Sequence, residues 1–152
     1  MFCRDWRASL RIALVTVLSV APACPVTAST TGGERELRTA ECVAALDARA
    51  DELVRQLKSG NSESRPVLLA TLNAGAAFIG LAYLQGERDE ARSQAQLIAA
   101  KETQKALSTA ELTERQASCA LEGTRLLADI NGLGRLVIVR LVDRRMQKLL
   151  GD

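Results

Sequence analysis

Residues 66–84 read PVLLATLNAGAAFIGLAYL, a stretch of 19 residues without a single charged side chain. As a helix it is long enough to cross a bilayer, because about 20 apolar residues span the hydrocarbon core. Its hydrophobicity is modest, however, since alanine supplies much of it and Asn73, Gly75 and Gly80 interrupt it. We therefore expect an alanine-rich helix surrounded by others at the centre of a bundle, with a membrane span as the alternative.

The glycines in this stretch need a physical reason, because each costs about 1 kcal/mol relative to alanine in a helix interior. Small side chains at Gly75, Ala76 and Gly80 would let a neighbouring helix approach closely, so we predict that these residues pack against one. Asn73 is expected to hydrogen-bond to an adjacent helix, since a buried amide needs partners.

The residues before this stretch predict another helix, which starts at Glu34 and is closed by Gly60. Its apolar residues recur at steps of three and four and so share one face: Val43, Leu46, Ala50, Leu53 and Leu57. Residues 60–64 are a polar loop, and Pro66 suits the first turn of the apolar helix. Residues 29–33 are expected to be a flexible start.

The residues after it predict a turn at 86–89 and a third helix that runs through Ala91, with a break near Ser108. Ser108 with Glu111, and Thr113 with Gln116, have the spacing of a capping box. The helical pattern ends at residues 131–134, and a last helix follows over 135–150. Its apolar run at 136–139 is also strand-like, but an isolated strand would lack a partner. The expected fold is all-α, an antiparallel bundle of four or five helices in one domain over residues 34–152.

The first 28 residues have the order of a secretory signal peptide. Arg4, Arg7 and Arg11 precede an apolar run, and residues 26–28 place small side chains at a cleavage site. The form of this leader indicates a bacterial protein delivered to the periplasm or secreted. The alternative is a lipoprotein signal in which Cys24 is acylated and anchors the protein to a membrane.

Cleavage after residue 28 would leave two cysteines, Cys42 and Cys119. An even pair in an oxidising compartment predicts one disulfide, with two buried free thiols as the alternative. A zinc site is disfavoured, because two thiolates need further ligands and the sequence contains no histidine.

The charge is balanced overall but unevenly distributed. The net charge of +2 comes from the leader, and the remaining residues contain 17 basic and 17 acidic side chains. Nucleic acid is therefore not an expected partner. Residues 34–52 are acidic and residues 135–148 are basic. Either the first and last helices pack side by side, or the basic helix faces anionic lipid or an acidic partner.

The sequence does not favour catalysis. Without histidine, Ser-His-Asp and Cys-His nucleophiles are excluded. The carboxylates alternate with basic residues, as on solvated helix faces. We expect no catalytic, cofactor-binding or metal-binding residues.

Two short segments resemble known families. Residues 77–91, AFIGLAYLQGERDEA, look like the middle of a tetratricopeptide repeat. That resemblance implies that Gly80 admits a neighbouring helix, that Tyr83 packs beside it, and that a tight helix pair forms. Residues 112–116, LTERQ, are similar to the LTxxQ motif of exported stress chaperones.

These observations together predict an exported, non-catalytic protein that binds another protein of the bacterial envelope. The sequence identifies neither that partner nor the oligomeric state. The alternative is a membrane-attached envelope component, held by acylated Cys24 or by a span at residues 66–84. Membrane contact is possible but not favoured.

Overall fold

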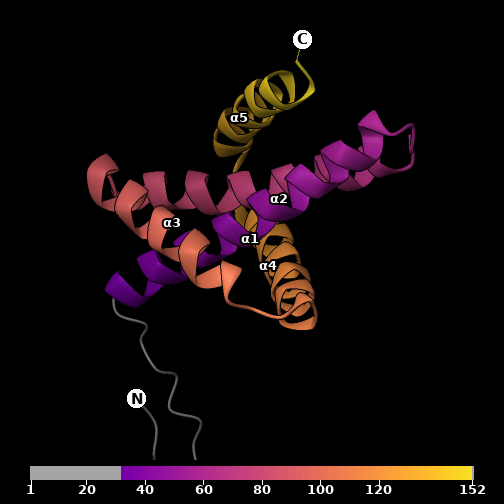
Figure 1. Ribbon diagram of the computed structural model, residues 1–152. Helices are drawn as coiled ribbons and strands as arrows, with labels where there is room; N and C mark the ends of the chain where they lie inside the picture. Colours follow the sequence, from indigo (N-terminus) through magenta and orange to yellow (C-terminus); the bar gives the residue numbers. More distant parts are fainter. Residues whose placement is uncertain (1–31, 152) are drawn as a thin grey trace, which may run out of the picture.

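A computed structural model describes residues 32–151, so the predicted leader and Cys24 lie outside the described residues. Five helices follow one another along the chain (Figure 1): α1 (Gly32–Lys58), α2 (Ser64–Leu84), α3 (Glu90–Lys105), α4 (Thr109–Asp129) and α5 (Gly132–Leu150). The described part of the chain contains no strand, and residues 136–139 lie within α5. The predicted all-α bundle is confirmed, with five helices.

The helix ends follow the predicted signals with four differences, one of which is that α2 already begins at Ser64, the last residue of the predicted loop. Ser108 and Glu111 form the expected capping box at the start of α4. Thr113 does not start a helix: it lies inside α4, where its hydroxyl donates to the carbonyl oxygen of Thr109 at 2.8 Å. Asn131 caps α5, which begins at Gly132 and not at residue 135. Likewise, α1 begins at Gly32, two residues before the predicted start.

The α1 and α2 helices form an antiparallel pair, to which the other helices are added (Figure 1). Both α4 and α5 pack on α2, whereas α3 packs on α1. Leu97 and Ala100 explain the position of α3, because they contribute to a small apolar cluster with Ala40 and Ala44 of α1. The helix that follows α2 in the chain therefore packs against α1 and not against α2.

The core surrounds α2 and contains the predicted disulfide. Cys42 of α1 and Cys119 of α4 are bridged, with their Cα atoms 5.2 Å apart and both side chains fully buried. Phe78 packs in the same cluster. A second cluster fills the other half of the molecule and includes Leu53, Leu68 and Ile138. The disulfide thus lies inside the core, where it links α1 directly to α4.

Within residues 32–151, α2 is the helix whose length and composition would suit a membrane span. Its central position accounts for part of this composition, because α1, α4 and α5 all pack on it and nine of its residues are buried. The expected burial on all sides is wrong, because only 39% of its apolar window is buried and Val67 and Leu69 are exposed. One side of α2 is left uncovered, along Gly75 and Ile79, and lines two adjacent hollows.

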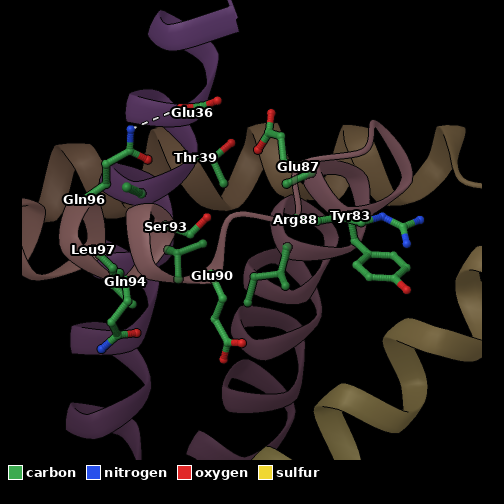
Figure 2. Close-up of a pocket in the computed structure, with 14 residues that line it drawn as sticks. Glu36, Thr39, Tyr83, Glu87, Arg88, Glu90, Ser93, Gln94, Gln96 and Leu97 are labelled. Carbon is green, nitrogen blue, oxygen red and sulfur yellow. Dashed lines mark hydrogen bonds between the residues drawn. The ribbon is translucent and has the colours of Figure 1, made fainter.

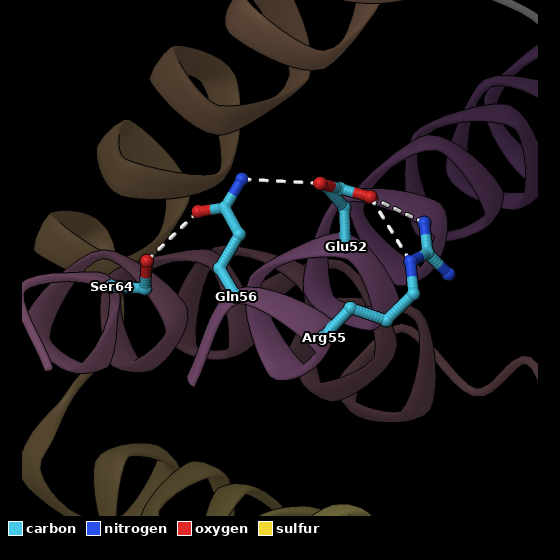
Figure 3. A network of polar contacts seen from close by, with 4 residues as sticks. All are labelled: Glu52, Arg55, Gln56 and Ser64. Carbon is cyan, nitrogen blue, oxygen red and sulfur yellow. Dashed lines mark hydrogen bonds and ion pairs between the residues drawn. The ribbon is translucent and has the colours of Figure 1, made fainter. Parts of the chain in front are cut away.

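A polar network holds the loop between α1 and α2 (Figure 3). The buried Ser64 donates from its hydroxyl to Gln56 Oε1 at 2.8 Å, and the Gln56 amide donates to Glu52 at 3.1 Å. Arg55 also donates to Glu52. Hydrogen bonds from Arg55 and then Gln56 lower the pKa of Glu52. The network satisfies Ser64 in the first turn of α2, where no side chain caps the helix.

Candidate functional site

The most prominent concave feature is a groove between α1 and α2. Two hollows make it up, with volumes of about 500 Å³ and about 220 Å³, and they share Val43 and Ile79. The larger hollow extends to α3, and the smaller one extends to α5. Figure 2 shows the larger hollow, where side chains of α1, the end of α2 and the start of α3 gather. We call the two hollows together the α1–α2 groove.

The sequence forms this groove through two matched helical stripes. On α1 the lining residues recur at three- and four-residue steps, and the same spacing occurs on α2. The α1 stripe consists of Glu36, Thr39, Ala40, Val43, Leu46 and Asp47. The α2 stripe consists of Leu72, Gly75, Ala76, Ile79, Ala82 and Tyr83. Gly75, Ala76 and Ala82 carry small side chains or none, which leaves space between the neighbouring helices.

Two acidic residues of α1 hold the helices that border the groove. Glu36 pairs with Arg92 of α3 at 2.6 Å and accepts a hydrogen bond from Gln96 at 3.2 Å. Asp47 pairs with Lys101 of α3 at 2.6 Å and also with Arg145 of α5. These side chains are all at least a fifth exposed, so we expect each pair to contribute little stability. They connect α3 and α5 to α1 along the edges of the groove.

The groove has an apolar floor and a polar mouth. Val43, Ile79 and Leu97 supply aliphatic surface, and Glu87 and Glu90 lie at the rim next to Arg88 (Figure 2). The Arg88 guanidinium lies 4.9 Å from the centre of the Tyr83 ring, within the range of a cation–π contact. No group of three or more metal-ligating side chains is found among residues 32–151. An open apolar floor with a charged rim is suited to holding apolar side chains of a partner.

The predicted packing residues take three different positions. Gly80 is buried against α5, since a Cβ there would lie 3.3 Å from Ile138 Cγ1. Gly75 and Ala76 line the groove, and a Cβ on Gly75 would make only an ordinary 3.8 Å contact with Leu46. Tyr83 does not bury itself between helices. Its side chain is 56% exposed at the groove mouth, because α3 packs on α1 and leaves this end of α2 open.

The closest helix approach involves a residue that the sequence analysis did not select. A Cβ on Gly123 of α4 would lie 2.6 Å from the carbonyl oxygen of Ala74. The sequence did contain a signal for this contact, because a glycine within the apolar pattern of a helix often allows close packing of a neighbouring helix. Asn73 also differs from expectation. It is only half-buried, it lines a hollow with Thr124 and Arg135, and its side chain makes no hydrogen bond within residues 32–151.

Comparison with protein-family models, curated proteins and solved structures found no match to this chain. The two short resemblances, at residues 77–91 and 112–116, therefore stay predictions. The candidate site is defined by its geometry alone.

Proposed function

We propose that this protein is an exported, non-catalytic binding protein of the bacterial envelope, which holds an apolar segment of another protein in the α1–α2 groove. The disulfide indicates an oxidising compartment, because such bonds persist outside the cytosol. The predicted leader narrows this to the periplasm or the exterior. A protein partner is preferred because the floor is apolar while the rim carries charges of both signs.

The observation that carries the proposal is the adjacency of two apolar hollows between α1 and α2. Val43 and Ile79 line both of them, so a ligand that lies across these two side chains would contact both helices in both hollows. An amphipathic helix lays one apolar face into such a groove and leaves its polar face in water. The carboxylates of Glu87 and Glu90 at the rim would favour basic residues on the partner's polar face.

The direct test is photo-crosslinking in living cells at Ile79. A photoreactive amino acid at Ile79 should give one discrete high-mass adduct, because that side chain is exposed in both hollows. The matched control places the same group at Leu121 of α4, which is also exposed but lies outside the groove. An adduct at Ile79 and none at Leu121 supports the proposal. Equal labelling at both positions, or none at Ile79, contradicts it.

A substitution pair then tests affinity. Once the crosslinked protein is identified, Ile79→Glu should weaken its binding at least tenfold, because a carboxylate would be buried against the apolar floor. Leu121→Glu should leave the affinity unchanged. If both variants bind as well as the parent, the groove is not the binding surface.

Export and anchoring are tested by intact mass of material from the cell envelope. Cleavage after Ala28 gives a chain that starts at Ser29, as the export proposal requires. A mass that includes a diacylglyceryl group on Cys24 would instead support the membrane-attached alternative.

A further inference from the structure

The outer side of α5 exposes large apolar side chains on adjacent turns. Leu133 is 76% exposed, Leu136 is 65% exposed and Val137 is 47% exposed. Their spacing of three and four residues places them on one side of the helix. Single exposed apolar residues are ordinary, but a contiguous group marks an interaction site.

The same side of α5 becomes basic toward its C-terminal end. Arg140, Arg144 and Lys148 continue the spacing, and all three are exposed, so three cations outweigh the exposed Asp143 that lies at the edge of the same side. None of them forms an ion pair within the described part of the chain, whereas Arg145 turns inward to Asp47. A cation in the last turn compensates the helix dipole, which accounts for Lys148 but not for Arg140 in the middle of the helix. We call Leu133, Leu136, Val137, Arg140, Arg144 and Lys148 the α5 outer face.

We propose that the α5 outer face binds the surface of a membrane that contains anionic phospholipids. Leucine and valine side chains enter the boundary between headgroups and acyl chains, while arginine and lysine reach the lipid phosphates. The cations are attracted by the negative surface potential of such a membrane. A second copy of this chain fits less well. Parallel pairing of two outer faces would bring their unpaired cations together, and antiparallel pairing would place the cations of one face against the leucines of the other.

The packing of α5 leaves this face available. The helix contacts α2 through its opposite side, where Ile138 and Val142 are buried. From the short connection at residues 130–131, α5 diverges from α4 and lies apart from it in Figure 1. Binding through this face would therefore leave the contact between α5 and α2 in place.

Vesicle co-sedimentation of the chain from Ser29 onward tests the proposal. The vesicles contain about one third phosphatidylglycerol in phosphatidylcholine, with pure phosphatidylcholine as the neutral reference. We expect at least tenfold stronger partitioning onto the anionic vesicles, and a loss of this preference when the ionic strength rises to about 1 M. The double variant Arg140→Glu/Arg144→Glu should abolish the preference, and Leu133→Gln/Leu136→Gln should weaken binding at least tenfold.

The matched control is Leu121→Gln/Arg125→Glu, which makes the same kinds of change on exposed positions of α4. It should bind anionic vesicles like the parent, and thermal melts should show that every variant is folded. Ile79→Glu should also bind like the parent, which separates this proposal from the groove. The proposal is overturned if the parent shows no preference for anionic vesicles, or if the α4 control loses as much binding. It is equally overturned if light scattering shows a dimer that Leu136→Gln dissociates, because the face would then be a contact between copies.

Discussion

Two sides of α2 carry similar small residues but are packed differently. Toward α4 the packing is close, with Gly123 of α4 against the carbonyl of Ala74 and the buried disulfide nearby. On the groove side, Gly75 has space in front of it and Ile79 is half-exposed. The missing side chain of Gly123 thus allows close contact between α4 and α2, whereas that of Gly75 leaves space in the groove. Glycine in a helix therefore signals closeness only when a neighbouring helix occupies the space.

The largest effect is expected from removing the disulfide on the closed side. The bridge closes a loop between residues 77 positions apart, which in the chain-entropy model is worth about 4 kcal/mol. The variant Cys42→Ala/Cys119→Ala should lose free energy of unfolding of this order in urea titrations. Reduction of the parent protein provides the comparison without a change of side chains. A loss below about 1 kcal/mol would mean that packing alone holds the closed side.

The next largest effect is expected from glycine-to-alanine substitutions, one on the α4 side of α2 and one on its groove side. Gly123→Ala should lose about 2–3 kcal/mol, because the new Cβ would meet Ala74 and push α4 away from α2. Gly75→Ala should gain up to about 1 kcal/mol, because the methyl group fits and alanine favours the helix. Chemical denaturation of both variants measures the difference. Equal changes in stability would remove the distinction between a closed and an open side.

A smaller loss is expected at the contact between α2 and α5. Gly80→Leu should destabilise the protein by about 1–2 kcal/mol, because Ile138 already lies 3.3 Å from the position of a Cβ. The higher helix propensity of leucine offsets part of this loss. Ser62→Leu in the exposed loop is the control, and we expect its melting temperature to match that of the parent. If Gly80→Leu is at least as stable as the parent, α5 moves to accommodate the new side chain, and the contact between α2 and α5 is loosely packed like the groove side.

The smallest effect concerns the start of α4, the helix of the closed side. Hydrogen bonds from the Ser108 side chain and then its backbone N–H lower the pKa of Glu111 below the ordinary value of 4.5 for a glutamate. A carboxyl group whose pKa is lower in the folded state stabilises the fold above the unfolded value, and this contribution disappears as the pH falls through the folded value. Stability should therefore decrease below about pH 4.5. Ser108→Ala should make this decrease shallower in denaturation series across that range, and an unchanged pH dependence would argue against the cap as its source.

The sequence predicted the helices well because their ends carry local signals. Gly60, Pro66 and Ser108 each act within one turn of the chain, and the structure places helix boundaries next to all three. The disulfide was predictable from the number of cysteines and the inferred compartment. These features depend on neighbours in sequence or on chemistry that needs no knowledge of the fold.

The groove was not predictable in the same way. An apolar helix such as α2 gives no indication of which side its neighbours leave uncovered, so Gly75 and Gly80 looked equivalent in the sequence. Their surroundings differ because α5 packs closely at Gly80, whereas Leu46 of α1 makes only an ordinary van der Waals contact at Gly75. The exposure of Tyr83 also depends on packing between distant segments, because α3 packs on α1 and leaves the end of α2 uncovered. Contacts between distant segments decided each of these outcomes.

The link between Cys42 and Cys119 also divides the molecule topologically. It makes a covalent ring that encloses all of α2 and α3, while α5 hangs outside it as a tail. A protease that cuts the connection at residues 106–108 would leave both pieces joined until a reductant is added. A cut at residues 130–131 would leave α5 held to the rest by non-covalent packing alone. Under mechanical pulling from the C-terminal end, the chain would unravel as far as Cys119 and stop there.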